Sequence, residues 1–339
     1  MKNSLIRISF LIIIVIGMLS LTNKFTKNAQ LSDFQELSVQ DVLIQLGAEK
    51  PLHYLEKTNK DSVTMGYEIV HFGQLKDKSN KRVSKFFVCT DCHNQVKEVE
   101  DLSNETASER LKYGMKNDLP FLPASTFYGQ YNKIHWYNGD YANKYGDLVI
   151  PTRDSLENAI QLCAVQCSQG RELEKWELRS ILHYYKSIEI KMSDLILTRD
   201  ESEKISNNLG RNAPKLVELL KSKYNQINDA TFGDLNPSEP KAYSPNLENG
   251  KYIYEKGCLH CHGMGKDITN FEFDSDKLTF SFLESKLEKH NHFTVPYIVR
   301  KGTYAVSGHK QYMPQYPLQK MNNAQLFDLI NYIKAESEK

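Results

Sequence analysis

One short pattern, Cys-x-x-Cys-His, occurs twice in this chain of 339 residues and constrains it more than any other feature. Residues 89–93 read Cys-Thr-Asp-Cys-His, and residues 258–262 read Cys-Leu-His-Cys-His. This spacing is the attachment signature of a c-type haem, because two thiols can form thioethers with the haem vinyl groups while the adjacent histidine reaches the iron. We therefore predict two covalently bound haems. The residues expected to hold them are Cys89, Cys92, His93, Cys258, Cys261 and His262. Zinc or redox Cys-x-x-Cys sites are the alternative.

Composition narrows the possible partners. The chain has 43 Lys plus Arg against 42 Asp plus Glu, which argues against a nucleic-acid partner or an anionic membrane surface. A length of 339 residues allows two or three domains. Four of the six cysteines belong to the two motifs, which leaves Cys163 and Cys167 to be explained.

The N-terminus has the composition of a targeting segment. Lys2 and Arg7 precede an apolar run over residues 8–21, which is short for a membrane span and typical of a signal-peptide core. We predict that residues 1–23 are a signal peptide or an N-terminal membrane anchor, with residues 5–21 as a possible inner-membrane tether. Both alternatives place the rest of the chain in the periplasm, and no later segment is apolar enough to span a bilayer.

The two halves of the chain repeat one order of elements. Residues 66–73 and 250–257 each predict a short helix with glycine and an aromatic residue ahead of a haem motif. Each half also ends in an amphipathic helix, and the two stripes align at a constant offset of 148 residues. The matching positions are Leu178, Ile181, Leu182, Tyr184, Tyr185 and Lys186 with Leu326, Leu329, Ile330, Tyr332, Ile333 and Lys334.

This order predicts an all-α fold with two class I cytochrome c domains in tandem, over residues 62–195 and 245–339. Residues 24–61 are expected to form a lead-in and residues 196–244 a linker, with a helix starting near Pro214. The first domain has a long aromatic segment between its motif and Cys163. Its residues could wall a haem face, although core packing explains them equally well. They are Phe127, Tyr128, Tyr131, Trp136, Tyr137, Tyr141 and Tyr145.

The sixth iron ligands are expected to differ between the halves. In the second half, Met313 lies 13 residues before Leu326, and a thioether ligand raises the reduction potential. The corresponding region of the first half lacks methionine but holds Cys163 and Cys167. A thiolate there could ligate the iron and lower its potential, or act as a nucleophile toward a sulfur substrate.

Other assignments remain open for the first half. Cys163 and Cys167 could form a disulfide or stay as buried thiols, although positions i and i+4 of one helix suit a disulfide poorly. Met115, His135 and His71 are rival ligands.

Taken together, residues 66–73, the two motifs, residues 163–173 and Met313 resemble the di-haem thiosulfate dehydrogenases, which are related to the haem subunit of the sulfur-oxidising complex. The resemblance implies a His/Cys-ligated active-site haem with Cys163 as the ligating and catalytic cysteine. It also implies a His/Met-ligated haem that exports electrons. Gln166 stands where the family has arginine, so Arg171, Arg153 or Lys144 would have to supply the positive charge for a sulfur anion.

Three functional hypotheses follow. The first is a di-haem electron-transfer cytochrome that works with a redox partner protein. The second adds oxidation of thiosulfate to tetrathionate, or the reverse, at the first haem. The third, a di-haem peroxidase, lacks a recognisable acid–base pair.

Overall fold

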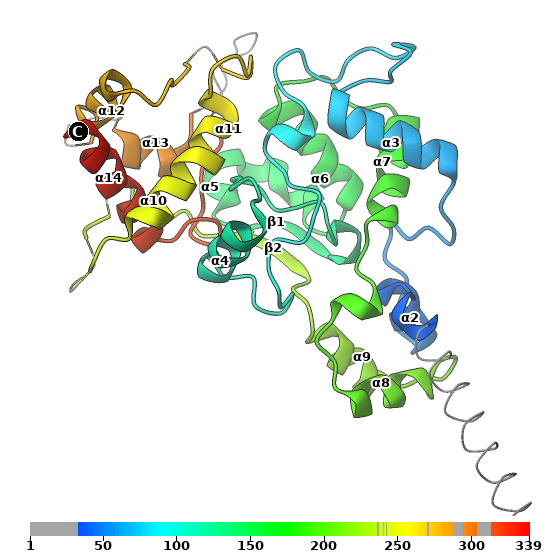
Figure 1. Cartoon of the computed structure of the whole chain (residues 1–339). Helices are drawn as coiled ribbons and strands as arrows, with labels where there is room; N and C mark the ends of the chain where they lie inside the picture. Colours follow the sequence, from blue (N-terminus) through cyan, green and yellow to red (C-terminus); the bar gives the residue numbers. More distant parts are fainter. Residues whose placement is uncertain are drawn as a thin grey trace, which may run out of the picture. The chain divides into compact units, whose positions relative to one another are not determined.

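A computed structural model describes residues 33–235, 237–239, 241, 243–269, 271–287, 294–303 and 313–339 (Figure 1). The predicted signal peptide or anchor, with the tether over residues 5–21, lies outside this part. The chain divides into two compact units. One contains Ile190–Leu220 with the described part of Met1–Ala48, and the other contains Glu49–Glu189 with Lys221–Lys339. Both haem motifs lie in the second unit, so the division into domains 62–195 and 245–339 remains a prediction.

The first half of the larger unit is built on helices α3 (Lys60–Phe72) and α7 (Lys175–Ser187), which pack side by side (Figure 1). Gly66 makes this crossing possible, because a Cβ atom there would lie 2.0 Å from the Ser180 carbonyl oxygen. Asn59 caps α3 by accepting a hydrogen bond from Ser62 N, and Gly73 ends it in the left-handed conformation. The predicted stripe of α7 faces the core, with Ile181 and Leu182 almost fully buried.

Helices α10 (Leu247–Ile253) and α14 (Asn323–Ser337) repeat this arrangement in the second half. A Cβ atom on Gly250 would lie 2.2 Å from the Asp328 carbonyl oxygen. Asp328 and Ser180 are separated by the same offset of 148 residues that aligns the two stripes. A second hydrophobic core forms around α10 and α14, distinct from the core around α3 and α7. Helices α12 (Lys277–Glu284) and α13 (Val295–Lys301) complete this half.

The long segment of the first half folds into short elements. They are α4 (Ala107–Asn117), β1 (His135–Gly139), α5 (Tyr141–Tyr145), the 3-10 helix η3 (Gly146–Thr152), α6 (Leu156–Leu162) and the π-helix η4 (Cys163–Cys167). Strand β1 pairs in parallel with β2 (Ile227–Ala230), and Gly139 lies opposite Ala230. The sequence did not predict this two-stranded sheet, because neither strand has an alternating apolar pattern.

The smaller unit joins two stretches far apart in the sequence. Helices α2 (Val39–Gln45), α8 (Arg199–Ser206) and α9 (Pro214–Lys221) carry its helical structure, and α9 begins at the predicted Pro214. Val39 N donates to Ile190 O at 3.0 Å, and Ala213 N donates to Leu46 O at 2.9 Å. Val39 and Leu46 are completely buried. The lead-in and the linker of the sequence interpretation are therefore packed segments that hold each other.

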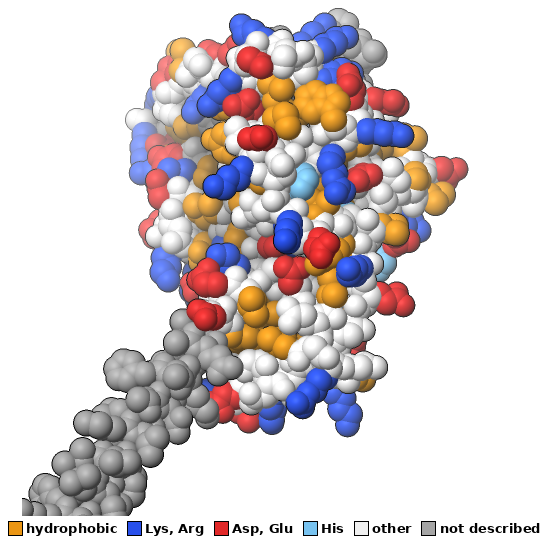
Figure 2. Space-filling view, turned by 90° about the vertical axis from the view of Figure 1, so that its right-hand side faces the viewer, with side chains coloured by type: hydrophobic (Ala, Val, Ile, Leu, Met, Phe, Trp, Pro, Cys, Tyr) orange, Lys and Arg blue, Asp and Glu red, His pale blue; other side chains and the backbone are white. Residues whose placement is uncertain are grey.

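The fold is mostly helical, with one glycine-mediated helix crossing in each half. Within the described residues, no helix has the length and apolarity required to cross a membrane. Positive and negative side chains are interspersed on the face shown in Figure 2, as expected for a chain whose net charge is +1.

Candidate haem sites and their contact

The first attachment segment forms one tight turn. Residues Cys89–Asp91 form the 3-10 helix η1, and His93 N donates to Cys89 O at 3.2 Å. The Asp91 carboxylate caps this turn by accepting a hydrogen bond from Val88 N at 2.8 Å. The turn therefore holds the two thiols and the imidazole as one compact group.

A hydrogen bond fixes the tautomer of His93. Its Nδ1 lies 2.6 Å from Ser125 O, and a carbonyl oxygen can only accept, so Nδ1 carries the proton and Nε2 has the lone pair. Burial lowers the pKa of His93 to about 4, which keeps the ring neutral at physiological pH. Phe127 stacks on the imidazole at 4.3 Å and fixes its plane. The arrangement is that of a histidine held as a metal ligand.

His262 has the same environment in the second motif. Its Nδ1 lies 2.6 Å from Phe271 O, and its ring stacks on Phe273 at 4.7 Å. Burial lowers the pKa of His262 as well. The segment enters through the π-helix η6 (Tyr254–Cys258) and continues in α11 (Leu259–His262). Each motif thus presents a neutral histidine whose Nε2 can bind iron.

A mostly apolar cavity lies beside the first motif. About 1380 Å³ of space, part of it open to solvent, is lined by Cys89, Cys92 and His93 together with side chains of α3, α6, α7 and β1. Five residues of the predicted aromatic segment lie in its wall, namely Phe127, Trp136, Tyr137, Tyr141 and Tyr145. An apolar cavity that meets two thiols and a neutral imidazole suits a covalently attached porphyrin.

The π-helix η4 brings both remaining cysteines to this cavity. Ser168 N donates to Cys163 O at 2.9 Å, which is the i to i+5 bond of a π-turn. Both thiols are free rather than joined in a disulfide. Tyr145 Oη lies 3.3 Å and Tyr137 Oη 3.8 Å from Cys167 Sγ.

The two thiols differ in acidity. The hydrogen bond from Cys163 contributes most to lowering the pKa of Cys167 to about 6, and Tyr145, Tyr137 and Lys144 add to it against the effect of burial. The same hydrogen bond, together with burial, raises the pKa of Cys163. The negative charge of the pair therefore resides on Cys167. The assignment of Cys163 as ligand and nucleophile remains a prediction.

The rival ligands lie outside the lining of this cavity. His135 Nδ1 is 2.6 Å from the Asp154 carboxylate, and His71 Nε2 is 3.3 Å from Tyr184 Oη. Met115 packs against the core of the second half. Among the cations expected to attract an anion, Arg171 instead pairs with Glu177 at 2.6 Å. The positive charge of Lys144 helps to lower the pKa of Cys167, and burial lowers the pKa of Lys144 to about 8.

Met313 lies in a constrained segment of the second half. Its N donates to Thr303 Oγ1 at 2.7 Å, and Thr303 N donates to Met313 O at 2.8 Å. A Cβ atom on Gly302, which has a φ of 68°, would lie 2.5 Å from Met313 O. Residues 304–312, between the two bonded positions, are outside the described part. The role of Met313 as sixth ligand stays a prediction.

The two attachment segments touch each other. Cys261 Sγ lies 3.9 Å from Asp91 O across 170 positions of sequence. Burial lowers the pKa of the neighbouring His260, and the backbone at Asp91 and Thr90 opposes that shift. The segment over residues 119–122 adds further bonds, since Phe121 N donates to Lys256 O at 2.9 Å. The sequence carried no signal for this contact.

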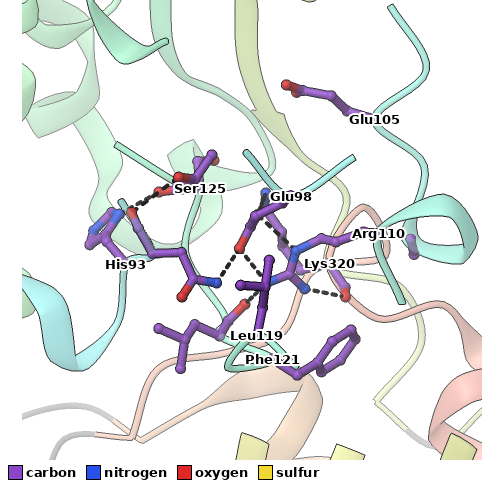
Figure 3. Close-up of polar contacts among 12 residues, drawn as sticks. His93, Glu98, Glu105, Arg110, Leu119, Phe121, Ser125 and Lys320 are labelled. Atoms are coloured by element: carbon purple, nitrogen blue, oxygen red, sulfur yellow. Dashed lines mark hydrogen bonds and ion pairs between the residues drawn. The ribbon is translucent and has the colours of Figure 1, made fainter. Parts of the chain in front are cut away.

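A buried cluster of charges lies behind His93 (Figure 3). Glu98 accepts from Arg110 Nε at 2.9 Å and from Asn94 Nδ2 at 2.6 Å, and Lys320 Nζ lies 3.7 Å from its carboxylate. Arg110 also donates to Lys320 O at 3.0 Å. The two cations lower the pKa of Glu98 to about 2, although burial alone would raise it. Sequence reasoning missed this cluster, because its members are 12 and 210 positions or more apart.

Comparison with known families agrees with the second half of the chain. The cytochrome c family profile matches residues 247–336. No curated protein and no solved structure matches the chain. The matched region contains the second attachment segment, Met313 and the crossing of α10 with α14. Residues 247–336 are therefore a cytochrome c domain, which implies a covalently bound c-type haem and electron transfer by a c-type cytochrome.

Proposed function

We propose that this chain is a di-haem c-type cytochrome that passes electrons between a haem held by residues 89–93 and a haem held by residues 258–262. The observation that carries the proposal is the contact of the two segments, with Cys261 Sγ 3.9 Å from Asp91 O. Because electron tunnelling falls steeply with distance, covalent attachment to touching segments favours rapid transfer between two haems.

Two parallels between the halves support a second haem site. His93 and His262 have the same tautomer, each fixed by a carbonyl oxygen at 2.6 Å and by a stacked phenylalanine. The glycine-mediated helix crossing also recurs, at Gly66 and at Gly250. Tandem cytochrome c domains of one design account for both parallels.

A haem, when bound, supplies one-electron oxidation and reduction at its iron. The protein contributes the axial nitrogen, a mostly apolar cavity beside the first motif, and the sixth ligands. We assign the sixth position of the second haem to Met313 and that of the first haem to one sulfur of the Cys163–Cys167 pair. Cys163 is the residue that the sequence predicts, and Cys167 is the sulfur that its neighbours favour as thiolate. Unlike ligands would give unequal potentials, and electrons would run from the first haem to the second.

Fast reduction kinetics test this function. A small one-electron reductant, mixed in substoichiometric amount with the oxidised holoprotein, should give a second kinetic phase whose rate is independent of protein concentration. The variant Cys89→Ala/Cys92→Ala, which keeps the cytochrome c domain, should lack that phase. Its absence from the wild-type holoprotein with two haems would refute transfer between them.

The cavity favours a second candidate function, oxidation of a small sulfur anion. Cys167, with a pKa of about 6, lines the cavity beside Tyr137 and Tyr145, and Lys144 adds positive charge. In the overall reaction, two thiosulfates would form tetrathionate and release two electrons, one to each haem. Thiosulfate mixed with the oxidised holoprotein should reduce haem in stopped-flow absorbance, and Lys144→Gln should weaken this response. No reduction at millimolar thiosulfate would remove this function while leaving electron transfer intact.

We also propose a location in the periplasm and a redox partner protein. Covalent haem attachment and the apolar run over residues 8–21 favour the periplasm, with residues 5–21 either removed as a signal or kept as a tether. A redox partner protein would exchange electrons with one of the haems.

A further inference from the structure

We propose that the buried ions Glu98, Arg110 and Lys320 set the reduction potential of the haem held by residues 89–93, and that Lys320 places this control partly in the cytochrome c domain. The inference rests on the proposed second haem. The charged cluster lies behind the axial histidine. In the hydrogen bonds described above, neither Cys163 nor Cys167 contacts this cluster.

The cluster is directly joined to the axial histidine's own segment. Asn94, the residue after His93, donates to Glu98 at 2.6 Å and to Pro120 O at 2.9 Å. Asn94 O in turn accepts from Phe127 N at 2.8 Å, and Phe127 is the ring stacked on His93. Arg110 donates to Leu122 O on the same loop. The charges are thus held at fixed positions relative to His93 by a continuous network (Figure 3).

Burial makes these charges effective. The side chains of Arg110, Glu98 and Lys320 are 4%, 7% and 14% exposed. Charges removed from water are screened less by solvent and salt than surface charges. One anion and two cations leave a net charge of +1. Positive charge favours the reduced haem, because reduction lowers the positive charge on the iron.

The field of the cluster distinguishes the two histidines. The cluster is bonded to the segment of His93, because Asn94 donates to Glu98 at 2.6 Å. His262 Nδ1 lies 2.6 Å from Phe271 O, in the other attachment segment. Lys320 belongs to residues 247–336, so the cytochrome c domain supplies a charge to the other haem's surroundings. A charge change in the cluster should therefore move the first haem's potential more than the second's.

The test is spectroelectrochemical titration of both haems in the holoprotein. Glu98→Gln raises the cluster charge to +2 and should shift the first haem's potential upward. Lys320→Met lowers the charge to zero and should shift it downward. The double variant Glu98→Gln/Lys320→Met restores +1 and should return it toward the wild-type value. A purely structural role would not give opposite shifts that cancel.

The exposed pair Lys116 and Glu100, 3.7 Å apart and 72% and 68% exposed, offers matched controls. Glu100→Gln and Lys116→Met make the same charge changes in solvent and should shift the potential much less. The proposal would be overturned if Glu98→Gln and Lys320→Met shifted the potential in the same direction. It would also be overturned if their shifts were no larger than those of the controls, or if both haems shifted equally. Haem content, measured separately as pyridine haemochrome, distinguishes this failure from failure of the di-haem assignment, and Lys320→Arg should retain the wild-type potential.

Discussion

Cys261 Sγ lies 3.9 Å from the backbone carbonyl oxygen of Asp91, so the second Cys-x-x-Cys-His segment lies directly against the first. This contact brings together two motifs that are far apart in the sequence. Residues 119–122, between the first motif and β1, also contact the second half of the chain. Tyr316 Oη donates to Phe121 O at 2.7 Å, and the two rings stack.

The helix crossing at Gly66 predicts a large effect of a single methyl group. Gly66→Ala would place Cβ 2.0 Å from Ser180 O, and α3 and α7 would have to separate. We expect a loss of unfolding free energy of about 1–3 kcal/mol or more. Denaturant unfolding of the holoprotein measures it. Thr64→Ala, on the exposed side of the same helix, is the control and should change stability by less than about 0.5 kcal/mol. Equal stability of the two variants would contradict the close crossing.

Glu98 predicts a specific acid sensitivity. Its pKa of about 2, below the ordinary 4.5, means that the ionised carboxylate stabilises the fold above pH 4.5. This contribution, roughly 3 kcal/mol, should fall as the pH decreases from about 4.5 toward 2. Unfolding free energy measured across this range should decrease more steeply in the wild type than in Glu98→Gln. Parallel pH profiles would show that folding does not lower the pKa of Glu98.

The thiol pair predicts a pH-dependent ligand. Electron paramagnetic resonance of the oxidised protein should show a thiolate-ligated low-spin haem at neutral pH, and the signal should disappear as acid protonates the thiolate. Coordination to iron should move this transition below the pKa of about 6 that Cys167 has without a metal. Tyr145→Phe removes a hydrogen bond that stabilises the thiolate, so the signal should disappear at a higher pH than in the wild type. Tyr113→Phe, on α4, is the control.

Single variants identify the sulfur. Loss of the signal in Cys163→Ala alone would support the sequence prediction, and loss in Cys167→Ala alone would assign the ligand to the more acidic thiol. A wild-type spectrum with only His/Met or bis-His haems would contradict thiolate ligation by either.

Local patterns predicted much of this structure. The motif spacing identified both histidines, and helical periodicity located α7, α9 and α14. These features depend on residues within one or two turns of each other. The π-turn over Cys163–Cys167 was not predicted, and it is this turn that brings both thiols to the cavity.

Contacts between distant segments could not be predicted from one sequence. Residues 24–61 were expected to form a lead-in, yet residues 33–48 pack with residues 190–220. In the sequence, nothing distinguishes Glu98, Arg110 and Lys320 from ordinary surface ions. They form a cluster of charges only because the fold buries them together. The contact between Cys261 and Asp91 depends on backbone geometry, for which no residue pattern exists.

The intact mass of the mature polypeptide, made by cells competent in haem attachment, tests the central claim most directly. We expect the polypeptide mass plus two haems, falling to one haem in Cys89→Ala/Cys92→Ala and, separately, in Cys258→Ala/Cys261→Ala. A wild-type mass with one haem or none would contradict the account.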